Sequence, residues 1–351
     1  MIRDLPRGQF GAYLRTHYLN DRPNVLPRFS MGAGAIFMIQ RVRPHEESLA
    51  SDGTIAETDP RLLEEMVSLI AAQKLEAVSL DEMRRRLVEQ DMESRFVCFT
   101  FDGAYRSVRD FVYPLFLKRG IPFAIYAATD YLDGSALPWW LALEVLVKES
   151  DRLSVAIGDD AEELRCRSYA EKQIAYSRLY RRLSGLDHQS RETIIEALLR
   201  KQKFHKEIAA RREMLSLQEL AELAESELVT IGVHADSHQP LSGLSYDQAC
   251  DAVGKSLGIL ENATGTRPRH LAFPAGPSAS VTARDVKIAS DLELATAVTN
   301  IEGALWPEHA RELMALPRIA LDNDPATLVR ALMLSGGSVP ATGSKLHRAA
   351  G

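Results

Sequence analysis

The stretch that most constrains the fold is residues 95–130, which combine two apolar runs, a helical pattern and a carboxylate. Residues 96–101 (FVCFTF) are apolar and rich in aromatic and branched side chains, which is typical of a buried strand. Apolar residues then recur at helical spacing up to Gly120, and a second apolar run begins at Ile121. The pattern predicts a β-α-β unit with Asp102 at the end of its first strand.

The same alternation of strands and helices continues along most of the chain. Strands are expected at 228–233, 270–273 and 294–299, and helical patterns that begin with capping residues separate them. This alternation favours a parallel α/β architecture. The 351 residues suffice for two ordinary domains or for one large α/β barrel.

Three segments depart from the alternation. Residues 1–30 are irregular and are expected to form an N-terminal arm. Residues 336–351 are rich in small and basic residues, which predicts a disordered tail. Between about 150 and 225 the pattern is long, charged and helical with little sign of strands, and we interpret it as an inserted helical layer.

Composition excludes several classes of protein. The formal net charge of -6 gives no electrostatic reason to expect a nucleic-acid partner. No apolar run is long enough to cross a bilayer, and no long apolar segment follows the basic N-terminal residues, so we expect a cytoplasmic protein. The three cysteines are widely spaced, which suggests neither a disulfide framework nor a CxxC metal site.

Three short motifs each follow directly on an expected strand. Asp102 follows the first, His234 and His238 follow the strand at 228–233, and the turn PAG at 274–276 follows the next. In a parallel barrel such strand ends open on one rim, so residues distant in sequence meet there. We therefore expect the three motifs to share one pocket.

Each motif also has a plainer interpretation. Two imidazoles on one tight turn suit zinc or another transition metal, but on spacing alone His234 and His238 are more simply explained as exposed loop residues. Asp102 is placed either to act as a base or to cap the helix that follows. Adjacent tryptophans point in different directions on a helix, so at most one of Trp139 and Trp140 is expected in the core, and the other is a candidate to line a cleft.

In order and spacing, these motifs resemble those of the polysaccharide deacetylase family with the NodB homology domain, a carbohydrate esterase group that includes chitooligosaccharide deacetylases. The family motif TFDDG appears as TFDGA at 100–104, and H-S/T-x-x-H appears as HADSH at 234–238. A third motif, which ends in Pro-aromatic-Gly, appears as FPAG at 273–276. The tryptophan pair and LPRI at 316–319 are also similar to segments of bacterial members. The resemblance covers about residues 34–322.

The resemblance implies an α/β fold, a distorted parallel (β/α) barrel of about seven repeats that is related to the TIM barrel. One such domain would span 31–335 with the helical insertion inside it. It also implies a hydrolase acting on non-peptide C–N bonds, which removes N-acetyl groups from an oligosaccharide or polysaccharide with the help of a divalent metal.

Roles follow from the resemblance residue by residue. Asp102 is the expected general base, and His234 and His238 are the expected ligands of a metal, zinc in particular. Such a metal polarises the amide carbonyl and lowers the pKa of its bound water. The residues expected to bind substrate are Tyr105, Trp139, Trp140, Pro274, Ala275 and Gly276.

The chain departs from the family pattern at the expected metal site. Gly103 stands where the family has a metal-binding aspartate, and a catalytic zinc usually has three protein ligands. Asp236 and Asp130 are candidates for the missing ligand. Other family positions are also changed, namely Ala235, Ala275 and the pair Ile39-Gln40, and the late histidine that serves as general acid has no counterpart. The alternative hypothesis is therefore a sugar-binding pseudoenzyme of the same fold that has lost metal-dependent catalysis.

Overall fold

The structure is a computed structural model. It describes residues 32–50, 56–136, 138–157, 160–204, 212–236, 240–274, 281–324, 327 and 330–332. The expected arm at 1–30 and the expected tail at 336–351 lie outside the described residues.

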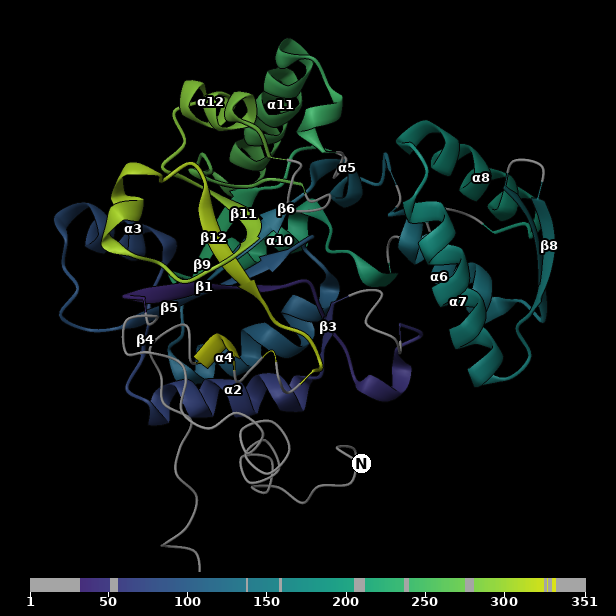
Figure 1. Cartoon of the computed structure of the whole chain (residues 1–351), viewed down its shortest axis with the longest axis horizontal. Coiled ribbons are helices and arrows are strands. Elements are labelled where there is room, and N and C mark those ends of the chain that lie inside the picture. Colours follow the sequence, from purple (N-terminus) through teal and green to yellow (C-terminus); the bar gives the residue numbers. More distant parts are fainter. Residues whose placement is uncertain are drawn as a thin grey trace, which may run out of the picture.

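In the described part of the chain, a parallel sheet closes into a barrel (Figure 1). The strand order is β4-β5-β6-β9-β10-β11-β12-β1, and β1 pairs with β5 as well as with β12. Seven strands therefore form a closed ring, and β4 pairs with β5 outside it. The predicted α/β barrel of about seven repeats is confirmed. The strands are β1 (Gly34–Ile39), β4 (Glu76–Ala77), β5 (Phe96–Asp102), β6 (Phe123–Ala127), β9 (Val229–Val233), β10 (His270–Ala272), β11 (Thr296–Glu302) and β12 (Leu316–Ala320).

Helices cover the outside of the barrel, with α11 and α12 on one side and α2 and α4 on the opposite side (Figure 1). Their starts follow the capping residues of the sequence. The side chain of Asp59 accepts a hydrogen bond at the start of α2, and Ser216 and Ser245 form capping boxes on α10 and α11. The helices are α2 (Pro60–Ala72), α3 (Leu80–Glu89), α4 (Tyr113–Arg119) with the π-helix η4 (Val108–Val112) before it, α5 (Thr129–Leu132), α10 (Leu217–Ala224), α11 (Tyr246–Thr264) and α12 (Ala283–Asp291).

Alternation along β5 separates two environments. Phe99 and Phe101 point outward and each makes an edge-to-face contact with Phe116 of α4. Since successive side chains of a strand point to opposite faces, Thr100 and Asp102 point into the barrel. The same rule places Arg318 of β12 inside the ring, where it is 1% exposed. The barrel interior thus holds charged groups beside apolar ones.

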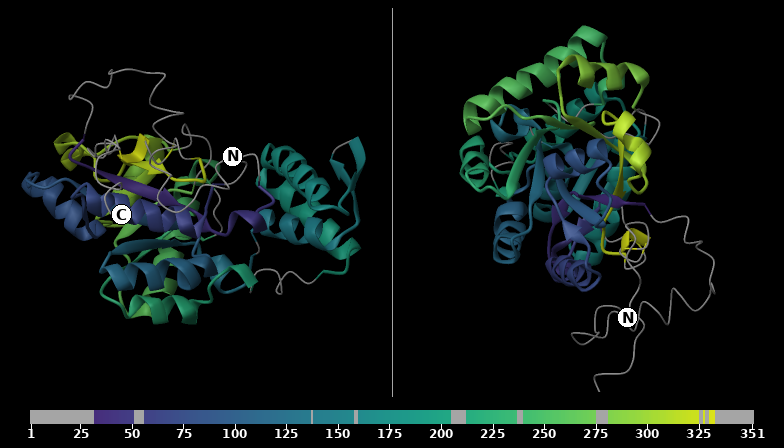
Figure 2. Two further views of the ribbon diagram at one scale, coloured as in Figure 1. Left: turned by 90° about the horizontal axis from the view of Figure 1, so that it is seen from below. Right: turned by 90° about the vertical axis from the view of Figure 1, so that its left-hand side faces the viewer.

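The insertion forms a second apolar cluster beside the barrel (Figures 1 and 2). It differs from the expected all-helical layer because β7 and β8 pair as an antiparallel hairpin. Leu153 and Val155 alternate with exposed residues along β7, a period-two pattern typical of a half-buried strand. Among the described residues, no helix is long and apolar enough to cross a membrane. The elements of the insertion are α6 (Trp139–Glu149), β7 (Arg152–Ile157), β8 (Asp160–Arg165), α7 (Tyr169–Ser184) and α8 (His188–Lys201).

Candidate functional site

A small cavity of about 60 Å³ lies at the end of β5 where Asp102 stands. Barrel segments supply its polar wall, and side chains from the insertion supply part of its aromatic wall. Since one water occupies about 30 Å³ of liquid, the cavity has room for about two waters or a group of that size. Its lining residues are Gln40, Asp102, Gly103, Tyr105, Tyr131, Trp140, Tyr180 and Met214. We call this cavity the small pocket.

Asp102 is the last residue of β5, is 4% exposed, and forms a two-pronged ion pair with Arg318. Nη1 of Arg318 donates to Oδ1 at 2.7 Å, and Nη2 donates to Oδ2 at 2.8 Å. Arg318 also donates to the carbonyl of Thr299 and to the side chain of Asn300. Such charge-assisted, bidentate pairs are strong and fix geometry. Asp102 ends β5, and the next helical residue is Arg106, so the interpretation of Asp102 as a helix cap stays a prediction.

His234 follows β9 and is buried, and its Nδ1 lies 2.7 Å from the carbonyl oxygen of Ala272. A carbonyl only accepts, so Nδ1 carries the proton and Nε2 is the acceptor nitrogen. Burial lowers the pKa of His234 below its usual range, although the charge of Asp102 opposes this shift. A neutral imidazole held in this way by a carbonyl is the usual form of a metal-binding histidine.

Gly103 adopts a φ of +103°, a conformation that favours glycine. A Cβ built at this position would lie 2.7 Å from Cε2 of Tyr105, closer than real contacts allow. Tyr105 is itself held in place, because its hydroxyl accepts a hydrogen bond from Nε1 of Trp140 at 2.8 Å. The ring of Tyr105 therefore occupies the space that a side chain at position 103 would need.

The described residues do not fit a three-ligand metal site. Among them, no group of three or more histidine, cysteine, aspartate and glutamate side chains is placed to hold a metal ion. His234 suits one ligand position, whereas Gly103 offers no side chain. Because His238 lies outside the described residues, the assignment of His234 and His238 as metal ligands stays a prediction.

Of the two candidates for a replacement ligand, Asp130 has a cationic partner. Asp130 forms an ion pair with Lys255 at 3.3 Å, and its backbone N–H donates to the carbonyl of Asp236. Burial raises the pKa of Asp130 above its usual range, and the nearby charge of Asp236 adds to this effect.

The expected substrate-binding residues fall into different places. Tyr105 and Trp140 line the small pocket. Trp139 belongs to the apolar cluster of the insertion, where its ring packs on Tyr180 at 4.7 Å between centroids. Pro274 is buried two residues after the end of β10. Ala275 and Gly276 lie outside the described residues.

Sequence reasoning missed several residues of the site. The sequence contains one indication that Arg318 belongs to the site: a charged residue inside the apolar segment LPRI needs a buried partner of opposite charge. Met214 comes from a segment with no motif, and it reaches the site through an antiparallel bridge with Tyr105. Gln40 carried a signal only as a changed family position, and no sequence pattern marked Tyr180 as a pocket residue.

A second group of buried charges lies near the site, and we call it the Arg41–Arg43 cluster: Arg41, Arg43, Glu57, Glu144 and Glu213. Glu144 of α6 accepts from both arginines, with 2.6 Å from Nη1 of Arg41 to Oε2. Burial alone would raise the pKa of Glu144, but the two arginines outweigh it and hold this pKa at about 2. The cluster joins the insertion to the short strands β2 (Arg41–Val42) and β3 (Glu57–Thr58), which form a separate two-stranded sheet.

Comparison with known proteins identifies relatives by sequence and by fold. The family model described as polysaccharide deacetylase matches residues 89–297 of the chain. A search of curated proteins finds no match.

Several solved structures share the fold. The Streptococcus pyogenes deacetylase PplD in complex with acetate is 16% identical, with a TM-score of 0.55, and the match covers 85% of this chain and 96% of that one. IcaB from Ammonifex degensii is 14% identical with a TM-score of 0.53, covering 86% and 96% of the two chains. The de-N-acetylase from Aggregatibacter actinomycetemcomitans is 10% identical with a TM-score of 0.53, covering 85% and 99%. At these identities, the likeness is one of fold.

Proposed function

The chain belongs to the polysaccharide deacetylase family, and we propose that it removes N-acetyl groups from an oligosaccharide or polysaccharide. The small pocket carries this proposal. A buried carboxylate, Asp102, stands at its base, and the aromatic side chains of Tyr105, Trp140 and Tyr180 form its walls. Its volume of about 60 Å³ accommodates a group the size of an acetamide but not a sugar ring.

The reaction is the hydrolysis of an amide. A water oxygen bonds to the carbonyl carbon, the C–N bond breaks, and the proton released by the water ends on the amine. Asp102 is the residue that we propose to accept this proton. A carboxylate has about four lone-pair sites, so the two hydrogen bonds from Arg318 do not exhaust its capacity to accept.

A second candidate function is binding of the same glycans without turnover. It is favoured by the conformation of Gly103, since the family ligand cannot be restored there while the Tyr105 ring keeps its position.

Acetate release and binding, measured in parallel on N-acetylated chitotetraose, distinguish the two candidates. We expect the wild-type protein to release acetate, and Asp102→Asn to lower the rate at least about 100-fold, the usual size of a general-base contribution. The assays are run with and without added zinc, and calorimetry reports binding.

Binding of the tetramer without acetate release under either condition would support the second candidate over the first. Absence of both binding and acetate release would refute both candidates. Gln40→Ala, which alters the pocket wall without changing a charge, is the matched control for Asp102→Asn.

A further inference from the structure

The Arg41–Arg43 cluster is connected through the backbone to two walls of the small pocket. Gln40 lines the pocket and is followed directly by Arg41. Met214 also lines the pocket and is preceded directly by Glu213. Because a planar peptide bond joins the two residues of each pair, the contacts of Arg41 and Glu213 constrain where the two wall residues lie.

The aromatic wall from the insertion is connected to the same cluster. Trp140 and Glu144 are four residues apart on α6, so their side chains are neighbours on one face of this helix. Glu144 accepts a hydrogen bond from Arg41 at 2.6 Å, and Trp140 donates one to the hydroxyl of Tyr105 at 2.8 Å. The guanidinium carbon of Arg41 lies 5.8 Å from the centre of the Tyr105 ring, within the range of a cation–π contact. These contacts form a closed circuit that begins and ends at Arg41.

Arg41 is the centre of these connections, and its side chain is 2% exposed. It forms ion pairs with three carboxylates, those of Glu57, Glu144 and Glu213. A guanidinium suits this position because its planar fork donates in several fixed directions at once. Two further cations, Arg43 and Lys148, pair with Glu144, so three positive charges face three carboxylates. Loss of the Arg41 charge would leave an excess of carboxylates, which repel one another strongly where water is scarce.

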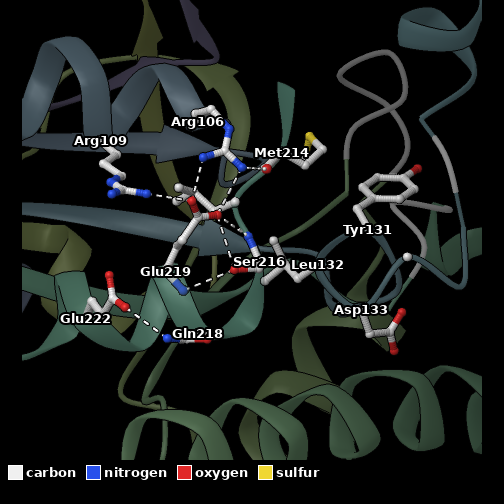
Figure 3. Close-up of a pocket in the computed structure, with 12 residues that line it drawn as sticks. Arg106, Arg109, Tyr131, Leu132, Asp133, Met214, Ser216, Gln218, Glu219 and Glu222 are labelled. Carbon is white, nitrogen blue, oxygen red and sulfur yellow. Dashed lines mark hydrogen bonds and ion pairs between the residues drawn. The ribbon is translucent and has the colours of Figure 1, made fainter. Parts of the chain in front are cut away.

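One side of the small pocket borders open space. Tyr131 and Met214 line the pocket and also line a hollow of about 700 Å³ between η4, α5 and α10 (Figure 3). A side chain that borders a hollow on its far side has fewer contacts to resist displacement. The width of the pocket at Met214 therefore depends on what holds the adjoining Glu213, which pairs with both arginines of the cluster.

We propose that Arg41 is a positioning residue, which sets the distance between the pocket walls and thereby the size of the acyl group that fits. Its contacts hold Gln40, Trp140 and Met214 around a space of about 60 Å³. A longer acyl chain fits only when these walls move apart. The inference rests on the proposed function and deepens it, because it concerns which N-acyl group the same pocket accepts.

Chitotetraose that carries N-propionyl groups in place of N-acetyl groups tests this role, because each acyl chain is longer by one methylene group. For the wild-type protein we expect kcat/KM to be at least about tenfold higher for the N-acetylated tetramer, the lower end of what one methylene gives. Arg41→Met should reduce this ratio to about threefold or less, since walls that can move apart discriminate poorly against the methylene. Arg41→Lys keeps the charge without the planar fork, so its ratio should lie between those two values.

Leu260→Ala is the matched control for a general loss of stability. Leu260 is fully buried on α11 and lies outside both the pocket lining and the cluster. The variant should be less stable than the wild type but should keep the wild-type ratio of kcat/KM. The inference is overturned if the wild type accepts both tetramers equally well, or if Arg41→Met changes the ratio no more than Leu260→Ala does.

Calorimetric binding of the same two tetramers separates this inference from the proposed function. If neither tetramer is hydrolysed, the proposed function fails. The positioning role then stands if the wild type binds the N-acetylated tetramer more tightly and Arg41→Met narrows that difference. Acetate release by the wild type together with an unchanged ratio in Arg41→Met removes the positioning role and leaves the proposed function intact. If neither tetramer binds or reacts, both are refuted.

Discussion

Two groups of buried charges lie near the site, and they are built differently. Asp102 and Arg318 form a one-to-one pair whose side chains are 5% and 1% exposed. The Arg41–Arg43 cluster sets two arginines against three glutamates, and one of these, Glu213, is 34% exposed. The pair joins two strands of the barrel, whereas the cluster joins β2 and β3 to the insertion.

This difference predicts how much stability the protein should lose when one residue of each group is substituted. In the pair, removal of one partner leaves a buried charge with its principal counterion gone, which costs several kcal/mol. In the cluster, each arginine contacts more than one carboxylate, so the remaining members compensate in part. Substitutions in the pair should therefore cost more stability than substitutions in the cluster.

Arg318→Met should have the largest effect. It leaves the buried Asp102 carboxylate without its guanidinium partner, and we expect the free energy of unfolding to fall by about 3–5 kcal/mol. Urea unfolding followed by circular dichroism measures the change.

The matched control is the double variant Asp102→Leu with Arg318→Met. Replacement of both members of a buried pair by apolar residues is often neutral or stabilising, so the double variant should be more stable than Arg318→Met alone. If the two variants are equally unstable, the loss comes from packing and not from the uncompensated charge of Asp102.

Protonation of Glu144 should have the next largest effect. It should appear as a fall in the free energy of unfolding as the pH is lowered. The pKa of Glu144 in the folded protein is about 2, below the usual 4.5. Its contribution to the free energy of unfolding is therefore fully present above about pH 4.5 and is lost as the pH falls toward 2. The shift corresponds to about 3 kcal/mol. Urea unfolding of the wild-type protein from about pH 6 to about pH 3 should show this loss.

Glu144→Gln tests the assignment, because an amide does not titrate in this range. The variant should be less stable than the wild type near neutral pH and should lose stability less steeply on acidification. If the free energy of unfolding falls equally steeply with pH in the wild type and in Glu144→Gln, other carboxylates account for the acid sensitivity.

Glu213→Gln should have the smallest effect. Glu213 contacts both Arg41 and Arg43, but it is partly exposed and Glu144 remains in place. We expect the free energy of unfolding to fall by about 1 kcal/mol or less, measured by the same urea titration. A loss as large as that of Arg318→Met would break the distinction between pair and cluster.

Local patterns predicted the barrel well. The apolar run that ends at Asp102, the helix stop at Gly120 and the capping residues each report on neighbours a few positions away. Such signals suffice to order strands and helices along the chain. Because the carboxyl ends of parallel barrel strands share one rim, the same order predicts that Asp102 and His234 lie at one end of the barrel.

The contacts that define the site could not be predicted in the same way. The partner of Asp102 lies 216 residues further along the chain, and their meeting depends on closure of the ring between β1 and β12. The obstacle at Gly103 is the ring of a residue only two positions away, yet it follows from backbone angles that composition does not reveal. The hairpin at β7 did leave a period-two signal, which the surrounding charged helices obscured.

The position of Arg318 in the last strand of the ring has a consequence for how the protein is made. The ribosome synthesises Asp102 long before its partner, and until β12 is added β1 and β11 each have an unpaired edge. Exposed strand edges and incomplete cores favour aggregation during folding. A nascent chain therefore carries a carboxylate without its arginine partner and an open sheet until β12 is synthesised, and this one segment completes both.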